Sequence, residues 1–163
     1  LFEPNRVPSF RAAYQRYDWN WNGGPPPYGS RGGVNTKWPV TVLDLATGNG
    51  ESIYPPERDI KIWSDGLTGL VLFADVKELT IAYGRHDTVN NGYVLHLTNI
   101  CVEPNLLATY RAQLTPDGRR ATNFLPAVRN DQRIGTADGN RVTLAITDGG
   151  EYLDPRSDKD WWR

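Results

Sequence analysis

From residue 40 onward, short runs of apolar and β-branched residues alternate with turn-forming residues, a pattern typical of β-strands. The segments 78–83 and 92–100 each place apolar side chains on one face and polar side chains on the other. We expect these two segments to pair antiparallel, because only a polar turn separates them. The whole pattern predicts strands over residues 40–45, 59–63, 67–75, 78–83, 92–100, 132–137 and 141–148.

Residues 104–114 predict a short helix. They begin with a proline, which suits the first helical turn, and Leu106, Tyr110 and Leu114 recur at helical spacing. Seven or eight short strands with one helix predict a mainly β fold, either a single small β-barrel or a sandwich of antiparallel strands. Such strands bury a shared face only by wrapping or stacking. We expect residues 40–163 to form this globular domain.

Residues 1–39 predict an irregular N-terminal arm that is rich in proline, glycine and tryptophan. Proline lacks a backbone donor and glycine adds chain entropy, so we expect little regular structure, with at most a short helix over residues 10–17. The arm is too aromatic for an ordinary flexible linker. We therefore expect it to pack along its own domain, to dock on a neighbouring subunit, or to present its rings to a ligand.

Length and charge narrow the class of protein. The 163 residues, 39% of them hydrophobic, fit one compact domain. The formal net charge of −1 gives no broad attraction to nucleic acid, so we expect no nucleic-acid partner. No apolar stretch approaches the roughly 20 residues needed to span a bilayer, so we expect no membrane span.

The numbers of cysteines and histidines argue against a disulfide and against a metal site. Cys101 is the single cysteine, which rules out an internal disulfide, and His86 and His96 are the two histidines. We therefore expect no metal and no cofactor. The chain has no methionine, and we interpret Leu1 as an end left by removal of an export signal or by truncation. Its many Trp, Tyr and Asn residues favour an extracellular or cell-surface location.

Two segments of the C-terminal third carry a family resemblance. Residues 128–135 read V-R-N-D-Q-R-I-G, and a later segment reads G-E-Y-L-D-P. They resemble the V-x-x-G-Q-x-I-G turn and the G-x-x-x-D-P ending of lysostaphin-type peptidase barrels, a fold shared with lipoyl-like domains. The resemblance implies a β-barrel over residues 60–155. Where the family has metal-binding histidines this chain has Val142, Leu144 and Gln113, so the resemblance implies no zinc-dependent peptidase chemistry.

His96 and Cys101 form a candidate pair of base and thiol nucleophile, which would have to lie in hydrogen-bond contact. Their separation of five puts them on opposite faces of a continuous strand, whereas a bend near Asn99 would reverse this. We interpret Cys101 as a buried structural residue beside a half-exposed histidine. His86 and Asp87 lie in a polar turn, which predicts a solvated loop or a ligand contact, since two adjacent side chains do not make a metal site alone.

The carboxylates leave a hydrolase open as an alternative. A glycosidase needs two of them on either side of a cleft, about 5–10 Å apart, and the sequence does not place them so. An enzyme is therefore the less favoured class. The candidates are Asp44, Glu51, Glu57, Asp59, Asp75 and Glu78.

The aromatic residues give the strongest functional signal. Trp and Tyr have flat apolar faces with a polar edge, which suits stacking on sugar rings or burial at protein interfaces. We predict a non-catalytic module that binds glycan or a cell-wall polymer. A structural subunit that uses its arm to contact copies of itself is the alternative, and rings that merely cap the ends of a barrel are the third interpretation. The candidate ligand-binding residues are Trp19, Trp21, Tyr28, Trp38, Tyr54, Trp63, His86, Asp87, Trp161 and Trp162.

Overall fold

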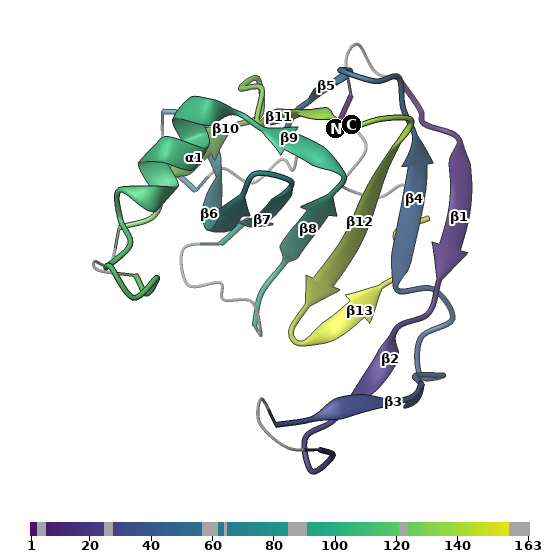
Figure 1. Cartoon of the computed structure of the whole chain (residues 1–163). Helices are drawn as coiled ribbons and strands as arrows, with labels where there is room; N and C mark the ends of the chain where they lie inside the picture. Colours follow the sequence, from purple (N-terminus) through teal and green to yellow (C-terminus); the bar gives the residue numbers. More distant parts are fainter. Residues whose placement is uncertain are drawn as a thin grey trace.

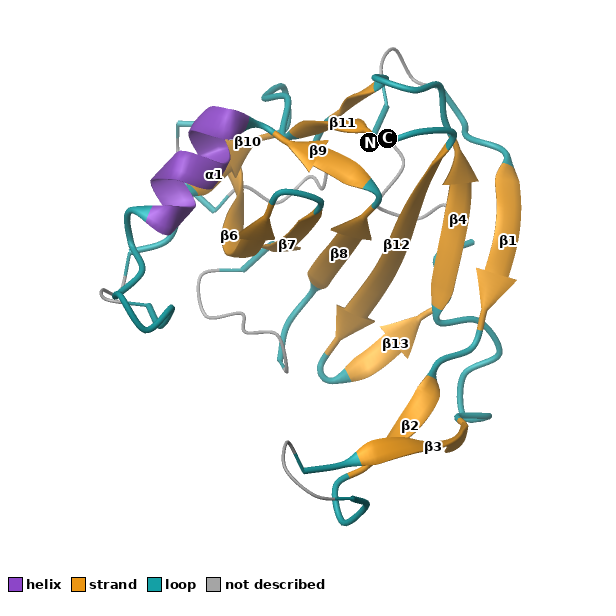
Figure 2. Ribbon diagram, viewed as in Figure 1, coloured by secondary structure: helices purple, strands orange, loops and turns teal. Residues whose placement is uncertain are grey.

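A computed structural model of the chain describes residues 1–2, 6–24, 28–56, 62–63, 65–84, 91–120 and 124–156. Within these ranges the chain forms thirteen strands and one helix, and every strand pair is antiparallel (Figures 1 and 2). The mainly β fold class predicted from the sequence is therefore confirmed.

The larger of the sheets has eight strands in the order β1-β4-β12-β8-β7-β6-β10, with β13 paired to β12. Their bounds are β1 Phe10–Tyr14, β4 Val42–Ala46, β12 Arg141–Asp148, β8 Val94–Thr98, β7 Glu78–Ala82, β6 Leu67–Asp75, β10 Ala127–Arg129 and β13 Glu151–Leu153. β4 pairs with the first half of β12 and β13 with the second half, so both lie along the same edge of β12. β1 and β10 end the sheet, which is therefore not a closed barrel within the described residues.

A three-stranded sheet lies across one end of the larger sheet (Figure 1). It consists of β5 (Ser52–Ile53), β11 (Gly135–Ala137) and β9 (Ile100–Val102). Apolar side chains of both sheets, such as Ile100 and Leu144, belong to one buried cluster. Of the two predicted architectures, a sandwich therefore describes the fold.

The core follows from the alternation of the strands and from one helix. In β12, Val142 and Leu144 are almost fully buried, because every second side chain of a strand points to the same face. The predicted helix is α1 (Pro104–Arg111), which adds Leu106 and Tyr110 to the same core. Within the described ranges, no helix is long and apolar enough to cross a membrane.

Most strand predictions after residue 40 agree with the structure. β6 and β12 have the predicted bounds, and β7 and β8 form the predicted antiparallel pair. The segments predicted over residues 40–45 and 132–137 correspond to β4 and to the shorter β11. The strand predicted over residues 59–63 lies largely outside the described residues.

The turn after β12 is a two-residue hairpin. Gly149 and Gly150 both have positive φ, 57° and 81°, which a type I′ hairpin turn requires at its two central positions. The strand that follows, β13, is not among the predicted strands, because three residues are too short to give a strand pattern. β13 exists because it pairs with β12.

The N-terminal arm requires a correction. The helix predicted over residues 10–17 is wrong, because Phe10–Tyr14 forms the edge strand β1, paired with β4. The following residues are not irregular either: β2 (Tyr17–Asn20) and β3 (Ser30–Val34) form a two-stranded hairpin. A helix of two turns is unstable without tertiary contacts, whereas β1 gains backbone hydrogen bonds from a strand about 30 residues later.

Candidate functional site

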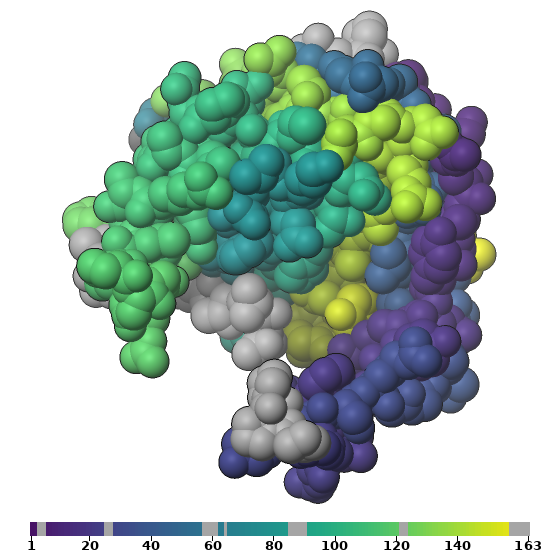
Figure 3. All heavy atoms as spheres, in the orientation of Figure 1, coloured from purple at the N-terminus to yellow at the C-terminus, as the bar shows by residue number. Residues whose placement is uncertain are grey.

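The β2–β3 hairpin projects from the body of the molecule, below the larger sheet in the views of Figures 1 and 3. Four aromatic residues of the hairpin and its loop are strongly exposed. The exposed fractions are 49% for Tyr17, 51% for Trp19, 74% for Trp21 and 71% for Tyr28. Large aromatic rings are normally drawn into a core by the hydrophobic effect, so this concentration makes the hairpin a candidate contact surface.

The rings gather on one face of the hairpin. Tyr17 and Trp19 both lie in β2, whose register shifts between them, and Arg31 is the partner of Trp19 in β3. The Arg31 guanidinium carbon is 4.5 Å from the centre of the Tyr17 ring. Trp21 meets Trp19 edge to face, with ring centres 6.3 Å apart and planes at 75°. We call Tyr17, Trp19, Trp21 and Arg31 the aromatic face.

A glycine fixes the position of Trp19. Gly29 has a φ of 119°, a conformation that other residues rarely adopt, and a Cβ on this residue would overlap the Trp19 indole. The ring therefore lies against the backbone of Gly29. The polar face of the hairpin is ordered as well, because the Asn35 amide donates a 2.7 Å hydrogen bond to Asp18.

The base of the hairpin is anchored to the larger sheet by stacked cations and rings. The Arg16 guanidinium lies 5.6 Å from the ring centre of Trp38 and 4.9 Å from that of Tyr152, in β13. Lys37 stacks on Trp38 at 4.6 Å and forms a 2.6 Å ion pair with Glu151. Trp38 is thus half-buried and already engaged, and its role in this structure is to hold the hairpin.

The remaining predicted ligand residues do not join the aromatic face. Tyr54 is half-buried and follows β5, which lies at the opposite end of the molecule from the hairpin (Figure 1). Trp63 is 48% exposed and precedes β6. His86, Asp87, Trp161 and Trp162 lie outside the described residues.

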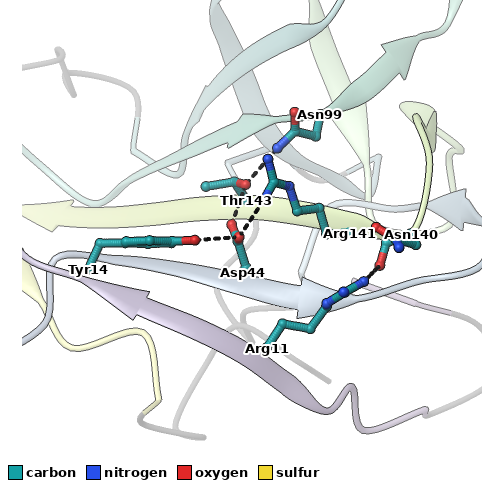
Figure 4. A network of polar contacts seen from close by, with 7 residues as sticks. All are labelled: Arg11, Tyr14, Asp44, Asn99, Asn140, Arg141 and Thr143. Atoms are coloured by element: carbon teal, nitrogen blue, oxygen red, sulfur yellow. Dashed lines mark hydrogen bonds and ion pairs between the residues drawn. The ribbon is translucent and has the colours of Figure 1, made fainter.

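A polar network that the sequence did not reveal surrounds Asp44 in β4 (Figure 4). This carboxylate is 3% exposed, and Tyr14 donates a 2.9 Å hydrogen bond to it. Thr143 also donates to Asp44, and an Arg141 guanidinium nitrogen lies 3.3 Å away. Asn99 in turn donates to the Thr143 hydroxyl at 2.7 Å.

The network connects β1, β4 and β12 through Asp44, and its hydrogen bonds leave this carboxylate little capacity to act in catalysis. Both Asp44 oxygens already accept hydrogen bonds, so the carboxylate is not free to take a proton from a substrate. Its hydrogen bond with Tyr14 raises the pKa of that phenol, which disfavours a tyrosinate nucleophile. One feature of the sequence indicates this network: Asp44 interrupts the apolar run of residues 42–45. In a strand it lies on the face opposite Leu43 and Leu45, which are buried.

His96 and Cys101 are not a catalytic pair in this structure. Asn99, with a φ of 59°, bends the chain between β8 and β9, so the two residues belong to different sheets. His96 Nδ1 lies 3.2 Å from the Thr80 hydroxyl, and burial lowers the pKa of its imidazole. The expectation of a buried Cys101 is wrong: its side chain points away from the core between Ile100 and Val102, and it is exposed.

In the described part of the chain, no three His, Cys, Asp or Glu side chains lie together so that they could hold a metal ion. Val142 and Leu144 lie in the core. The resemblance to that family stays a prediction. Comparison with protein-family models, curated proteins and solved structures finds no match to this chain.

Proposed function

We propose that the protein is a non-catalytic binding module of the cell surface or extracellular space, which holds a glycan against the aromatic face of its β2–β3 hairpin. The observation that carries the proposal is the concentration of exposed rings on one projecting element, with Trp19 and Trp21 exposed by 51% and 74%. Flat rings stack against the C–H faces of sugars and cost little conformational entropy when they are bound.

The polar residues of the hairpin complement its rings. Asn20 and Asn22 belong to the strand end and loop that also carry Trp21, and both side chains can reach solvent. Amide side chains donate and accept hydrogen bonds, which matches the hydroxyl groups around a sugar ring. Rings for stacking and amides for hydrogen bonds on one element support a glycan more than a purely apolar ligand.

The anchored base supports a binding role because it limits the entropy that the hairpin loses on binding. A two-stranded hairpin alone is marginally stable in water, and its contacts with Trp38 and Tyr152 through Arg16 hold it to the body. A pre-organised surface binds more tightly than a flexible one with the same contacts. The rings are therefore presented in a fixed arrangement.

The test is binding of the wild-type protein and three variants to a panel of soluble polysaccharides, by calorimetry and tryptophan fluorescence. We expect Trp19→Ala and Trp21→Ala each to weaken binding by about five- to tenfold, since a stacked ring contributes on the order of 1 kcal/mol. Phe124→Ala is the matched control, because Phe124 is as exposed as Trp21 but lies outside the hairpin. Unchanged binding of both tryptophan variants would overturn the proposal.

A structural subunit is the second candidate, favoured by the same exposed rings. Trp21 and Tyr28 are 74% and 71% exposed, and large aromatic rings are also typical of the buried centres of protein interfaces. Concentration-dependent association that is lost on deleting residues 15–35, with no binding to any glycan, would favour this second function.

A further inference from the structure

We infer that the glycan is an acidic one, whose uronic-acid carboxylates bind the guanidinium of Arg31. This inference rests on the proposed function and names the ligand class of the same aromatic face. Arg31 is exposed among the rings and has no carboxylate partner among the described residues.

Arg31 differs in this respect from most of the arginines that the structure describes. Arg6, Arg133 and Arg156 each form an ion pair of 2.6 Å with a glutamate or an aspartate. The acidic residue of the hairpin, Asp18, accepts a hydrogen bond from Asn35 and lies 3.8 Å from Arg16. The Arg31 guanidinium is therefore stacked on a ring, but no carboxylate among the described residues neutralises its charge.

The stacking prepares the guanidinium for an anion. Its carbon lies 4.5 Å from the ring centre of Tyr17, so the aromatic ring covers one face of the planar group. Hydrogen-bond donors of a guanidinium lie in its plane, and a stacked arginine therefore keeps N–H groups for a ligand. The fork of two parallel donors matches the two oxygens of a carboxylate.

The register of the hairpin places this fork beside a sugar-stacking ring. Trp19 and Arg31 lie directly opposite each other across β2 and β3. Side chains in such positions have Cβ atoms about 4.5–5.5 Å apart, a span comparable to a single sugar ring. The carboxylate of a uronic acid is attached to the rim of its sugar ring, so one residue of an acidic glycan would reach both groups at once.

The charge that favours an anion is that of Arg31 itself. Of the other basic residues near the N-terminus, Arg6 and Lys37 form ion pairs with glutamates, and Arg16 lies 3.8 Å from Asp18. Arg31 is therefore the basic side chain of the hairpin that is available to a carboxylate, and a neutral glycan would gain no ion pair from it.

The experiment compares two polymers that differ only in charge: oligogalacturonate and its methyl ester. We expect the wild-type protein to bind the acid about ten- to a hundredfold more tightly than the ester, the range for hydrogen bonds to charged groups. Arg31→Ala should abolish this preference, and Arg31→Lys should keep part of it, because lysine retains the charge but lacks the fork. Arg119→Ala is the control, since Arg119 is an exposed arginine far from the hairpin in sequence.

The outcomes separate the two proposals. Equal binding of the acid and the ester, or a preference that survives Arg31→Ala, would overturn the acidic ligand and leave the glycan-binding function standing. A preference for dextran sulfate over dextran that falls equally in the Arg31→Ala and Arg119→Ala proteins would indicate non-specific attraction and would also overturn the inference. Failure to bind any acidic or neutral glycan would refute the proposed function itself.

Discussion

The phenol of Tyr14 donates a 2.9 Å hydrogen bond to the carboxylate of Asp44, and this contact joins the edge strand β1 to its neighbour β4. The hairpin follows β1 after two residues, since β1 ends at Tyr14 and β2 begins at Tyr17. A buried carboxylate held by a hydroxyl, a phenol and a guanidinium is costly to disturb, because each partner loses a hydrogen bond when the carboxylate is removed.

Asp44→Ala should destabilise the fold by about 3 kcal/mol, the usual range for breaking a buried network that includes a charge. Tyr14→Phe should cost about 1 kcal/mol, since it removes one hydrogen bond and leaves the packing of the ring intact. Urea unfolding followed by circular dichroism measures both changes. Asp131→Ala, in an exposed turn, is the control and should change stability by less than about 0.5 kcal/mol.

Gly29→Ala should displace the Trp19 ring without unfolding the protein. The added methyl would overlap the indole, and a φ of 119° is strained for alanine. We expect a changed indole N–H resonance of Trp19 and weaker glycan binding, at an almost unchanged unfolding midpoint of the main sheet. Gly33→Ala in the same hairpin is the matched control, because nothing lies within 4 Å of the position that its methyl would take. Equal effects of both substitutions would contradict the proposed role of Gly29.

Arg16→Ala should loosen the hairpin while the sheet stays intact. The substitution removes the cation that lies against Trp38 and Tyr152, and each such contact contributes about 0.5–1 kcal/mol at an exposed site. Amide hydrogen exchange of residues 17–34 should therefore become faster, with unchanged protection in β8 and β12. Uniform loss of protection across the protein would instead mean that Arg16 supports the whole fold.

Because His96 is buried, we expect the free energy of unfolding to decrease as the pH is lowered. Burial lowers the pKa of this imidazole below its usual value near 6.5, so the unfolded chain binds a proton more readily than the folded one. Stability should decrease as the pH falls through about 6.5 and level off below the folded-state pKa, where both states are protonated. The measurement is the unfolding free energy of the wild-type and His96→Gln proteins against pH. An identical pH dependence of the two would assign the effect to other groups.

The sequence predicts those parts of the fold whose signal is local. β6 and β12 are identified with their bounds because apolar runs and alternation end at turns. β1 could not be identified, since it is a strand only through its pairing with β4. In the same way, the aromatic residues pointed to the arm, but the position of Arg31 opposite Trp19 depends on the hairpin register.

The network around Asp44 illustrates the same limit for polar residues. Arg141 and Thr143 follow it by 97 and 99 residues, and no spacing rule links residues so far apart. The sequence showed only a carboxylate within an apolar strand. Its partners became evident when β12 was found beside β4.

The residues that anchor the hairpin are synthesised at very different times. Arg16 leaves the ribosome more than a hundred residues before Tyr152, one of the two rings that hold it. β12, which supports β4 and carries β13, also comes late. During synthesis the aromatic face therefore emerges well before the strands that fix it in place, so its rings exist for a time without their anchor.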